Sequence, residues 1–226
     1  MNVEAVIFDL DGTLAEFNLD YKTVRAEVME LMRNHGLPDS IFSMRESIHE
    51  TLKKAEIYMR NNGRIDEELL AIRKRALSIA SQHEMKAARE TSLLPGVLET
   101  VKTLNGMGLK LGIFTINGMR STNFILDNLG LHQFFDAIVT REDVQEVKPD
   151  PSHLAKALKT LNTDPERTIV VGDSITDMKS AKSLGVTAVG VATSEGTKRK
   201  LNTAGATETI KSVADLPALI KELNKS

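Results

Sequence analysis

The sequence predicts an α/β fold, a Rossmann-like parallel-sheet core into which a helical cap domain is inserted. Two observations predict it. Short apolar runs, typical of strands buried on both faces, alternate with longer segments whose apolar residues recur at helical spacing. This alternation stops over residues 15–94, which have helical periodicity only, and resumes at Pro95-Gly96. We therefore expect a core of residues 1–14 and 95–226 and a cap of residues 15–94.

Five short apolar runs are the predicted strands of the core. Such runs are expected where helices cover both faces of a parallel sheet. The runs are Ala5–Phe8, Lys110–Thr115, Ala137–Thr140, Thr168–Gly172 and Ala188–Val191. Crossover helices are predicted at Val97–Met107, Met119–Leu129, Pro151–Leu161, Ile175–Leu184 and Val213–Leu223.

The interval assigned to the cap contains three helix-start signals. Asp20 is a predicted N-cap of a first helix, which Gly36 would end. Ser43 and Glu46 have the spacing of a capping box, just ahead of a second helical stretch. Asp66 is a predicted N-cap of a third and longer helix. The cap is therefore expected to be helical throughout.

The composition excludes several classes of function. The chain has a formal net charge of −2, whereas proteins that bind nucleic-acid polymers have an excess of basic residues. The absence of Cys excludes disulfides, thiolate nucleophiles and Cys-ligated metals, so any metal must have oxygen or imidazole ligands. The first residues do not read as a signal peptide, and no stretch approaches membrane-spanning length. We expect a cytoplasmic protein that partners neither a nucleic acid nor a membrane.

Reactive side chains follow four of the predicted strands. An open parallel sheet binds its ligands outside the carboxyl ends of its strands, so these segments belong to one edge. They are DLDGTL at 9–14, TING at 115–118, VKPDP at 147–151 and GDSITD at 172–177. One such segment alone is typical of a turn or a helix cap. Four of them in order along one sheet indicate an active site.

The residue types in these segments suit phosphoryl transfer through a carboxylate. Asp9 and Asp173, at the ends of two strands, could offer hard oxygen ligands to one Mg²⁺. Thr115 could donate a hydrogen bond to a phosphate oxygen, and Lys148 could add positive charge where negative charge gathers. Asp11 could protonate the leaving oxygen and later activate water.

The four segments resemble the motifs of the haloacid dehalogenase-like (HAD) hydrolase superfamily, in particular its phosphoglycolate phosphatase-like group with a helical cap. The resemblance extends from Val3 to about Val191. It implies that Asp9 is the nucleophile and a metal ligand, and that Asp11 is the general acid and base and a ligand through its backbone carbonyl. Residues 15–17 read Ala-Glu-Phe, where many phosphoglycolate phosphatases have Val/Ile-Asp-Ser.

The resemblance also implies roles for the later motifs. Thr115 and Lys148 would bind the phosphoryl group, with help from Asn117. Asp173 would complete the protein ligands of the metal, and Asp177 would orient metal-bound water. The second Asp of the first motif, which the dehalogenase branch lacks, indicates chemistry on phosphate rather than on carbon–halogen bonds.

Three functions fit these residues. The leading one is a Mg²⁺-dependent phosphatase that hydrolyses a small phosphorylated metabolite, a phosphate monoester, through an aspartyl-phosphate intermediate. A phosphomutase of the same superfamily, similar to beta-phosphoglucomutase, would use the same intermediate but keep water out. A receiver-like protein that is only phosphorylated on Asp ranks last, because it needs neither Asp11 nor an inserted cap.

Overall fold

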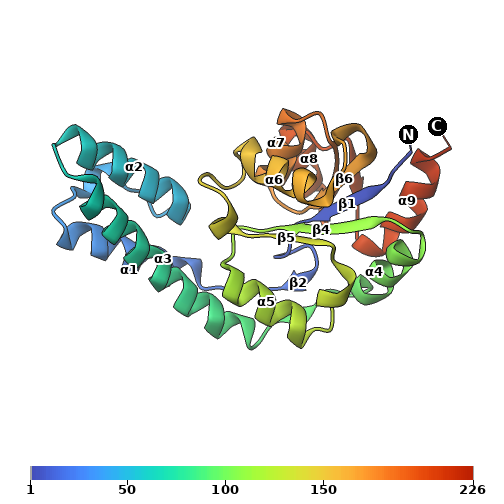
Figure 1. Ribbon diagram of the computed structural model, residues 1–226, viewed down its shortest axis with the longest axis horizontal. Coiled ribbons are helices and arrows are strands. Elements are labelled where there is room, and N and C mark those ends of the chain that lie inside the picture. Colours follow the sequence, from blue (N-terminus) through green and yellow to red (C-terminus); the bar gives the residue numbers. More distant parts are fainter. Residues whose placement is uncertain (1, 226) are drawn as a thin grey trace. The chain divides into compact units, whose positions relative to one another are not determined.

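The structure is a computed structural model that describes residues 2–225 and separates into two compact units. One unit contains the residues up to Phe17 and those from Ala88 onward, and the other is Asn18–Ala87. Figure 1 shows the elements of both. Within residues 2–225, none of the helices combines the length and the apolar composition that a membrane crossing requires.

The first unit is built on a six-stranded parallel sheet with the order β5-β4-β1-β6-β7-β8. The strands are β1 Ala5–Phe8, β4 Lys110–Phe114, β5 Ala137–Val139, β6 Thr168–Gly172, β7 Thr187–Val191 and β8 Glu208–Ile210. β1 lies between β4 and β6, with Phe8 opposite Ile113 on one side and Val171 on the other. The three strands therefore end together, which places the residues after them at one edge of the sheet.

Helices cover both faces of the sheet, as Figure 1 shows. On one face lie α6 Pro151–Leu161, α7 Ile175–Ser183 and α8 Glu195–Ala204. On the other lie α4 Val97–Gly106, α5 Met119–Asn128 and α9 Leu216–Leu223. Each layer has its own hydrophobic core against the sheet. The predicted α/β fold with a Rossmann-like parallel sheet is confirmed.

The second unit, Asn18–Ala87, contains α1 Tyr21–Asn34, α2 Ile48–Asn61 and α3 Asp66–Ala88, the last of which ends one residue beyond it. These helices bury a separate apolar core that includes Met32, Leu52 and Ile72. Asp20 caps α1, as predicted, by accepting the Thr23 backbone N–H at 3.1 Å. Short 3₁₀ turns in the two units lie at Asp39–Ile41, His132–Phe134, Arg141–Asp143, Pro165–Arg167 and Val213–Asp215.

Two capping predictions in this unit are wrong. The capping box of α2 is formed by Ser47 and Glu50 rather than by Ser43 and Glu46. Ser43 belongs to a preceding turn, in which its carbonyl accepts the Glu46 N–H. Asp66 is the first residue of α3 rather than its cap, and there it adds negative charge at the positive end of the helix dipole.

The interval between the first two core strands is not helical throughout. Its two ends pair as a short antiparallel ribbon, in which β2 Ala15–Glu16 lies beside β3 Ser92–Leu93. Two residues per strand are too few to show a period of two, so the sequence pattern could not indicate them. The ribbon brings the outgoing and returning chain side by side.

Two further elements of the core, β8 and α8, were not predicted from the sequence. β8 is a three-residue edge strand that pairs only with β7, and its first residue is exposed. α8 buries only Leu201 and Ala204, so it has almost no apolar stripe. The other predicted core helices and strands are present, with ends that differ by at most one residue except at Val213–Leu223, which begins as a 3₁₀ turn.

Candidate active site

The candidate site lies where β1, β4 and β6 end. Asp9 directly follows β1, and its backbone N–H continues the ladder by donating to the Val171 carbonyl at 2.9 Å. Thr115 directly follows β4, and its N–H donates to the Val139 carbonyl of β5. Asp173 directly follows β6. The parallel register therefore brings together three polar side chains that are far apart in the sequence.

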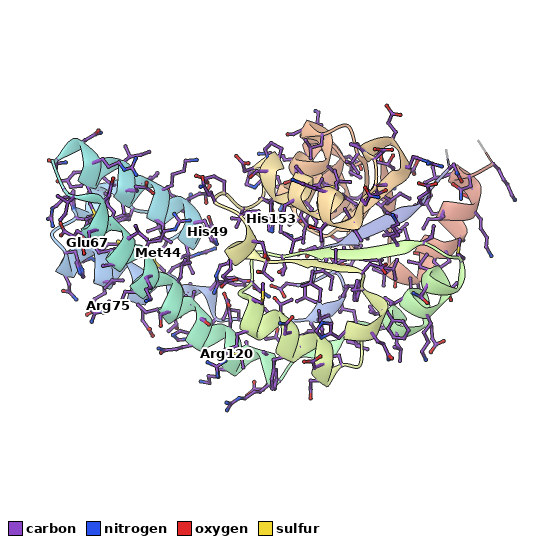
Figure 2. All side chains as sticks on the ribbon, in the orientation of Figure 1. Met44, His49, Glu67, Arg75, Arg120 and His153 are labelled. Carbon is purple, nitrogen blue, oxygen red and sulfur yellow. The ribbon has the colours of Figure 1, made fainter. Side chains whose placement is uncertain are left out.

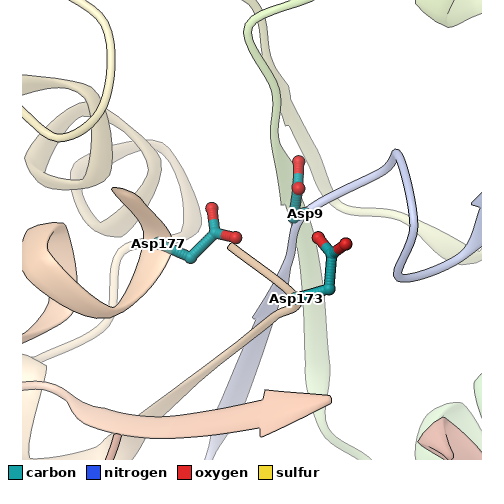
Figure 3. Close-up of side chains that lie close together, drawn as sticks. All are labelled: Asp9, Asp173 and Asp177. Atoms are coloured by element: carbon teal, nitrogen blue, oxygen red, sulfur yellow. The ribbon is translucent and has the colours of Figure 1, made fainter. Parts of the chain in front are cut away.

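Three carboxylates gather at this edge. One carboxylate oxygen from each of Asp9, Asp173 and Asp177 lies within 4.8 Å of the other two. Figure 3 shows the three side chains close together. Asp9 and Asp177 are buried, and Asp173 is half-buried. Burial, and then the negative charge of Asp177, raise the pKa of Asp9 well above its ordinary range, and the same two causes raise the pKa of Asp173 to about 6. Raised pKa values in a close group of carboxylates mean that a cation would be bound favourably there.

Lys148 is the cation that the chain itself places in this group. Its Nζ lies 2.6 Å from Asp9 Oδ1 and 2.7 Å from Asp177 Oδ1, and it donates to the Phe114 carbonyl at 3.2 Å. These three contacts match the three hydrogens of an ammonium. Burial alone would lower the pKa of Lys148, but Asp177 and Asp9 raise it above its ordinary value. Lys148 is therefore protonated and partly neutralises the cluster.

Asp177 is held in place by a capping box at the start of α7. Ser174 is the N-cap, and its backbone N–H and hydroxyl both donate to Asp177 Oδ2, at 3.0 and 2.6 Å. The other oxygen, Oδ1, accepts from Lys148. A Cβ at Gly172 would lie 2.4 Å from Asp177 Oδ2, so glycine makes room for this carboxylate. Ser174, and not Asp173, is therefore the N-cap of α7.

Asp11 and Asn117 face one another across the same edge. Asn117 Nδ2 donates to Asp11 Oδ1 at 2.9 Å, and the Asn117 backbone N–H donates to the Thr115 hydroxyl at 3.2 Å. Thr115 and Asn117 are buried, whereas Asp11 is half-buried. The hydroxyl of Thr115 thus accepts from its own loop, and its hydrogen is the donor it can offer to a ligand.

The structure brings together all the site residues that the sequence indicates. They form two groups, and the members of the carboxylate group differ from the expected set of metal ligands. The carboxylate cluster contains Asp177 beside Asp9 and Asp173, whereas Asp11 lies opposite Asn117. Both oxygens of Asp177 already accept hydrogen bonds from Ser174 and Lys148. Carboxylate oxygens are the ligands that Mg²⁺ prefers, so the donor set fits that ion.

Two contributors to the site were missed in the sequence. Ser174 has the Ser-x-x-Asp spacing of a capping box with Asp177, a signal that could have identified it. Phe114 contributes its carbonyl and its ring, since Lys148 Nζ lies 4.3 Å from the ring centroid. No local pattern in the sequence announces that contact, because the two residues are joined only by the fold.

Comparisons with known proteins agree with this arrangement. The chain matches the family described as haloacid dehalogenase-like hydrolase over residues 6–191. It is 34% identical, over 188 residues and 82% of each chain, to the pyrophosphatase PpaX of Halalkalibacterium halodurans. Among solved structures, a hydrolase from Pseudomonas syringae is 26% identical with a TM-score of 0.67, covering 97% of this chain and 99% of that one. A phosphonoacetaldehyde hydrolase-like protein from Oleispira antarctica shares the fold, with 22% identity, a TM-score of 0.71, and 100% and 94% coverage.

Proposed function

The chain belongs to the haloacid dehalogenase-like hydrolases, and we propose that it is a Mg²⁺-dependent phosphatase that hydrolyses a small phosphate monoester through an aspartyl phosphate on Asp9. One observation carries the proposal. A buried ammonium, Lys148, lies between Asp9 and Asp177 at the edge of the sheet where Asp173 also lies. A buried carboxylate with a matched cation is suited to attack a phosphorus atom that anionic oxygens surround.

Asp9 is the proposed nucleophile. Lys148 Nζ and the Leu10 N–H, the latter at 2.7 Å, both contact Oδ1 of its carboxylate and so fix the orientation of the group. In the first step a carboxylate oxygen of Asp9 forms a bond to phosphorus, and the bond from phosphorus to the leaving oxygen breaks. The product that leaves is an alcohol, and the phosphoryl group remains on Asp9.

Asp11 is the proposed general acid and base. Its carboxyl group gives a proton to the leaving oxygen in the first step and takes one from water in the second. That water forms a bond to phosphorus, the bond from phosphorus to Asp9 breaks, and inorganic phosphate leaves. The hydrogen bond from Asn117 to Asp11 Oδ1 supports this role, because it orients a side chain that must reach the leaving oxygen.

Asp9, Asp173 and the backbone carbonyl of Asp11 are the groups that would hold Mg²⁺, and Asp177 would orient its water. When bound, the ion supplies positive charge that offsets the repulsion between Asp9 and the anionic phosphate. The raised pKa values of Asp9 and Asp173 support this assignment, since burial and the Asp177 carboxylate both disfavour their charged forms, which a bound cation would stabilise.

Thr115, Lys148 and Asn117 are the groups that would bind the phosphoryl oxygens. The Thr115 hydroxyl has a hydrogen to donate, and the Lys148 ammonium lies beside the nucleophile. The proposed substrate is a small phosphorylated metabolite in the cytoplasm rather than a nucleic-acid polymer or a membrane component. The relative named pyrophosphatase makes pyrophosphate a second candidate, in which phosphate itself would be the leaving group.

A screen for phosphate release tests the proposal. The purified protein is incubated with phosphoglycolate, sugar phosphates, nucleotides and pyrophosphate, with and without Mg²⁺, beside the Asp9→Asn variant. We expect Mg²⁺-dependent release from at least one compound and none from the variant. Isomerised sugar phosphate without net phosphate would show a phosphomutase instead. A stable phosphoprotein without turnover would show a receiver-like function, and no reaction at all would overturn the proposal.

A further inference from the structure

Lys148 is held from its backbone side by a histidine that the mechanism does not use. His153 is the third residue of α6, and Figure 2 labels it near the start of that helix. The Lys148 backbone N–H donates to His153 Nδ1 at 3.2 Å, and both residues are buried. Asp150 caps the helix by accepting the Ser152 N–H at 2.9 Å, which fixes the turn between the lysine and the histidine.

The same imidazole also lies against the ring beneath the ammonium. His153 and Phe114 meet edge to face, with ring centroids 5.6 Å apart and an interplanar angle of 62°. Lys148 Nζ lies 4.3 Å from the centroid of the Phe114 ring and donates to the Phe114 carbonyl. His153 therefore contacts the lysine at its backbone and also contacts the aromatic surface on which its ammonium lies.

The direction of the hydrogen bond defines the protonation of His153. A backbone N–H is always the donor, so Nδ1 must be the acceptor and cannot have a hydrogen. The imidazole is then neutral, with its proton on Nε2. A buried backbone N–H that loses its acceptor is costly, so the segment containing Lys148 would move to find another one.

We propose that His153 is a positioning residue for Lys148, which it holds against Asp9 and Asp177 through the Nδ1 hydrogen bond and the Phe114 ring. The inference rests on the proposed function, in which Lys148 neutralises the nucleophile and binds the phosphoryl group. Displacement of a reacting group by about 1 Å can lower a rate on the order of 10²-fold. Loss of this support should therefore lower kcat without removing any group that touches the substrate.

Two substitutions at one position separate the hydrogen bond from the packing. Asn places its side-chain oxygen where His has Nδ1, so His153→Asn keeps an acceptor. Phe keeps a ring against Phe114 but has no acceptor, so His153→Phe removes only the hydrogen bond. Leu154→Ala is the matched control, because Leu154 is fully buried in the next position of α6 and does not bond to Lys148.

The assay measures kcat and KM with the most active phosphate compound, and thermal unfolding of each variant. We expect His153→Phe to lose kcat on the order of 10²-fold, while His153→Asn stays within a few-fold of the unsubstituted protein. Leu154→Ala should lower Tm but keep kcat. Full activity in His153→Phe, or an equal loss in all three variants, would overturn the positioning role.

Two further measurements keep the inference distinct from the proposed function. Lys148→Met should lose activity. If it does not, or if the unsubstituted protein releases no phosphate, the proposed function is wrong, whatever the role of His153. The tautomer of His153 is measured in the unsubstituted protein and does not depend on activity. A variant is needed only to assign the His153 signal. An imidazole ¹H–¹⁵N spectrum, assigned by the signal missing in His153→Asn, should show Nδ1 without a proton. A proton on Nδ1 would overturn the inference.

Discussion

Gly12 lies so close to Asp173 that a Cβ on Gly12 would be 2.3 Å from Asp173 Oδ2. Gly12 also has a φ of +73°, a left-handed conformation that costs other residues on the order of 1 to 2 kcal/mol. The turn that follows Asp11 therefore favours a residue without a side chain at position 12. The same missing side chain leaves room for a proposed metal ligand.

Gly12→Ala is therefore expected to displace Asp173 and weaken Mg²⁺ binding. Activity should fall, and higher Mg²⁺ should restore part of it. Gly108→Ala is the matched control, because Gly108 has a φ of +78° but no neighbour within 4 Å of the added Cβ. Titration of activity against Mg²⁺ for both variants checks this. An unchanged Mg²⁺ dependence in Gly12→Ala would contradict the assignment of Asp173 as a ligand.

Asp11→Asn should fold and still bind Mg²⁺ but lose proton transfer. We expect kcat to fall on the order of 10²- to 10⁴-fold. The rate of aspartyl-phosphate formation should fall less with an aryl phosphate than with an alkyl phosphate, because a good leaving group needs no proton. The burst of alcohol or phenol in a stopped-flow or quenched experiment measures that step. Equal losses with both substrates would remove Asp11 from the acid role.

The pH dependence of stability should report the burial of Asp173 and the negative charge of Asp177 beside it. Its pKa of about 6 lies above the ordinary value of about 4, so between these pH values the folded protein binds a proton that the unfolded chain has lost. Stability of the metal-free protein should fall as pH rises through this window, and the cost should be fully present above it. The difference corresponds to at most about 3 kcal/mol.

Asp173→Asn removes this titration. Without metal, the variant should match the unsubstituted protein near pH 4 and be more stable at pH 7.5 in urea unfolding. Saturating Mg²⁺ should reverse the order, because an ion that binds the folded state more tightly stabilises it more at the same concentration. A variant that is less stable at pH 7.5 without metal would be inconsistent with the raised pKa.

Much of the site could be predicted because it depends on strand ends. Asp9, Thr115 and Asp173 follow buried apolar runs, and the rule that parallel strands end at one edge brings them together without further information. Contacts that join distant segments could not be predicted. The hydrogen bond from the Lys148 ammonium to the Phe114 carbonyl is such a contact and has no local signature. The bond from the Lys148 backbone N–H to His153 is local, but it follows no recognised capping pattern.

The wrong predictions about the fold came from local sequence signals that were ambiguous or too short. Ser43 and Ser47 are both followed by Glu three residues later, so both satisfy the capping-box pattern. In the structure only Ser47 has its hydroxyl at the helix start, where it accepts the Glu50 N–H, whereas Ser43 lies in a separate turn. The ribbon of β2 and β3 is too short for any periodic signal.

The inserted unit is expected to set substrate choice. β2 and β3 place Glu16 opposite Ser92, so a short Gly/Ser linker can replace residues 18–87 without crossing a wide gap. If cooperative thermal unfolding shows that the shortened protein folds, it should still react with an aryl phosphate. Its kcat/KM for the best natural substrate should fall far more, because remote binding energy is lost. An unchanged ranking of the phosphate panel would place selectivity in the loops of the sheet.

The covalent step at Asp9 is the central claim, and acid quenching during turnover tests it most directly. The protein is mixed with Mg²⁺ and its best substrate, quenched within the first turnovers, digested with pepsin at low pH and examined by mass spectrometry. The account predicts one phosphoryl group on the peptide that contains Asp9, and none when Asp9→Asn is treated in the same way. A phosphoryl group on another residue, or rapid phosphate release by Asp9→Asn, would contradict it.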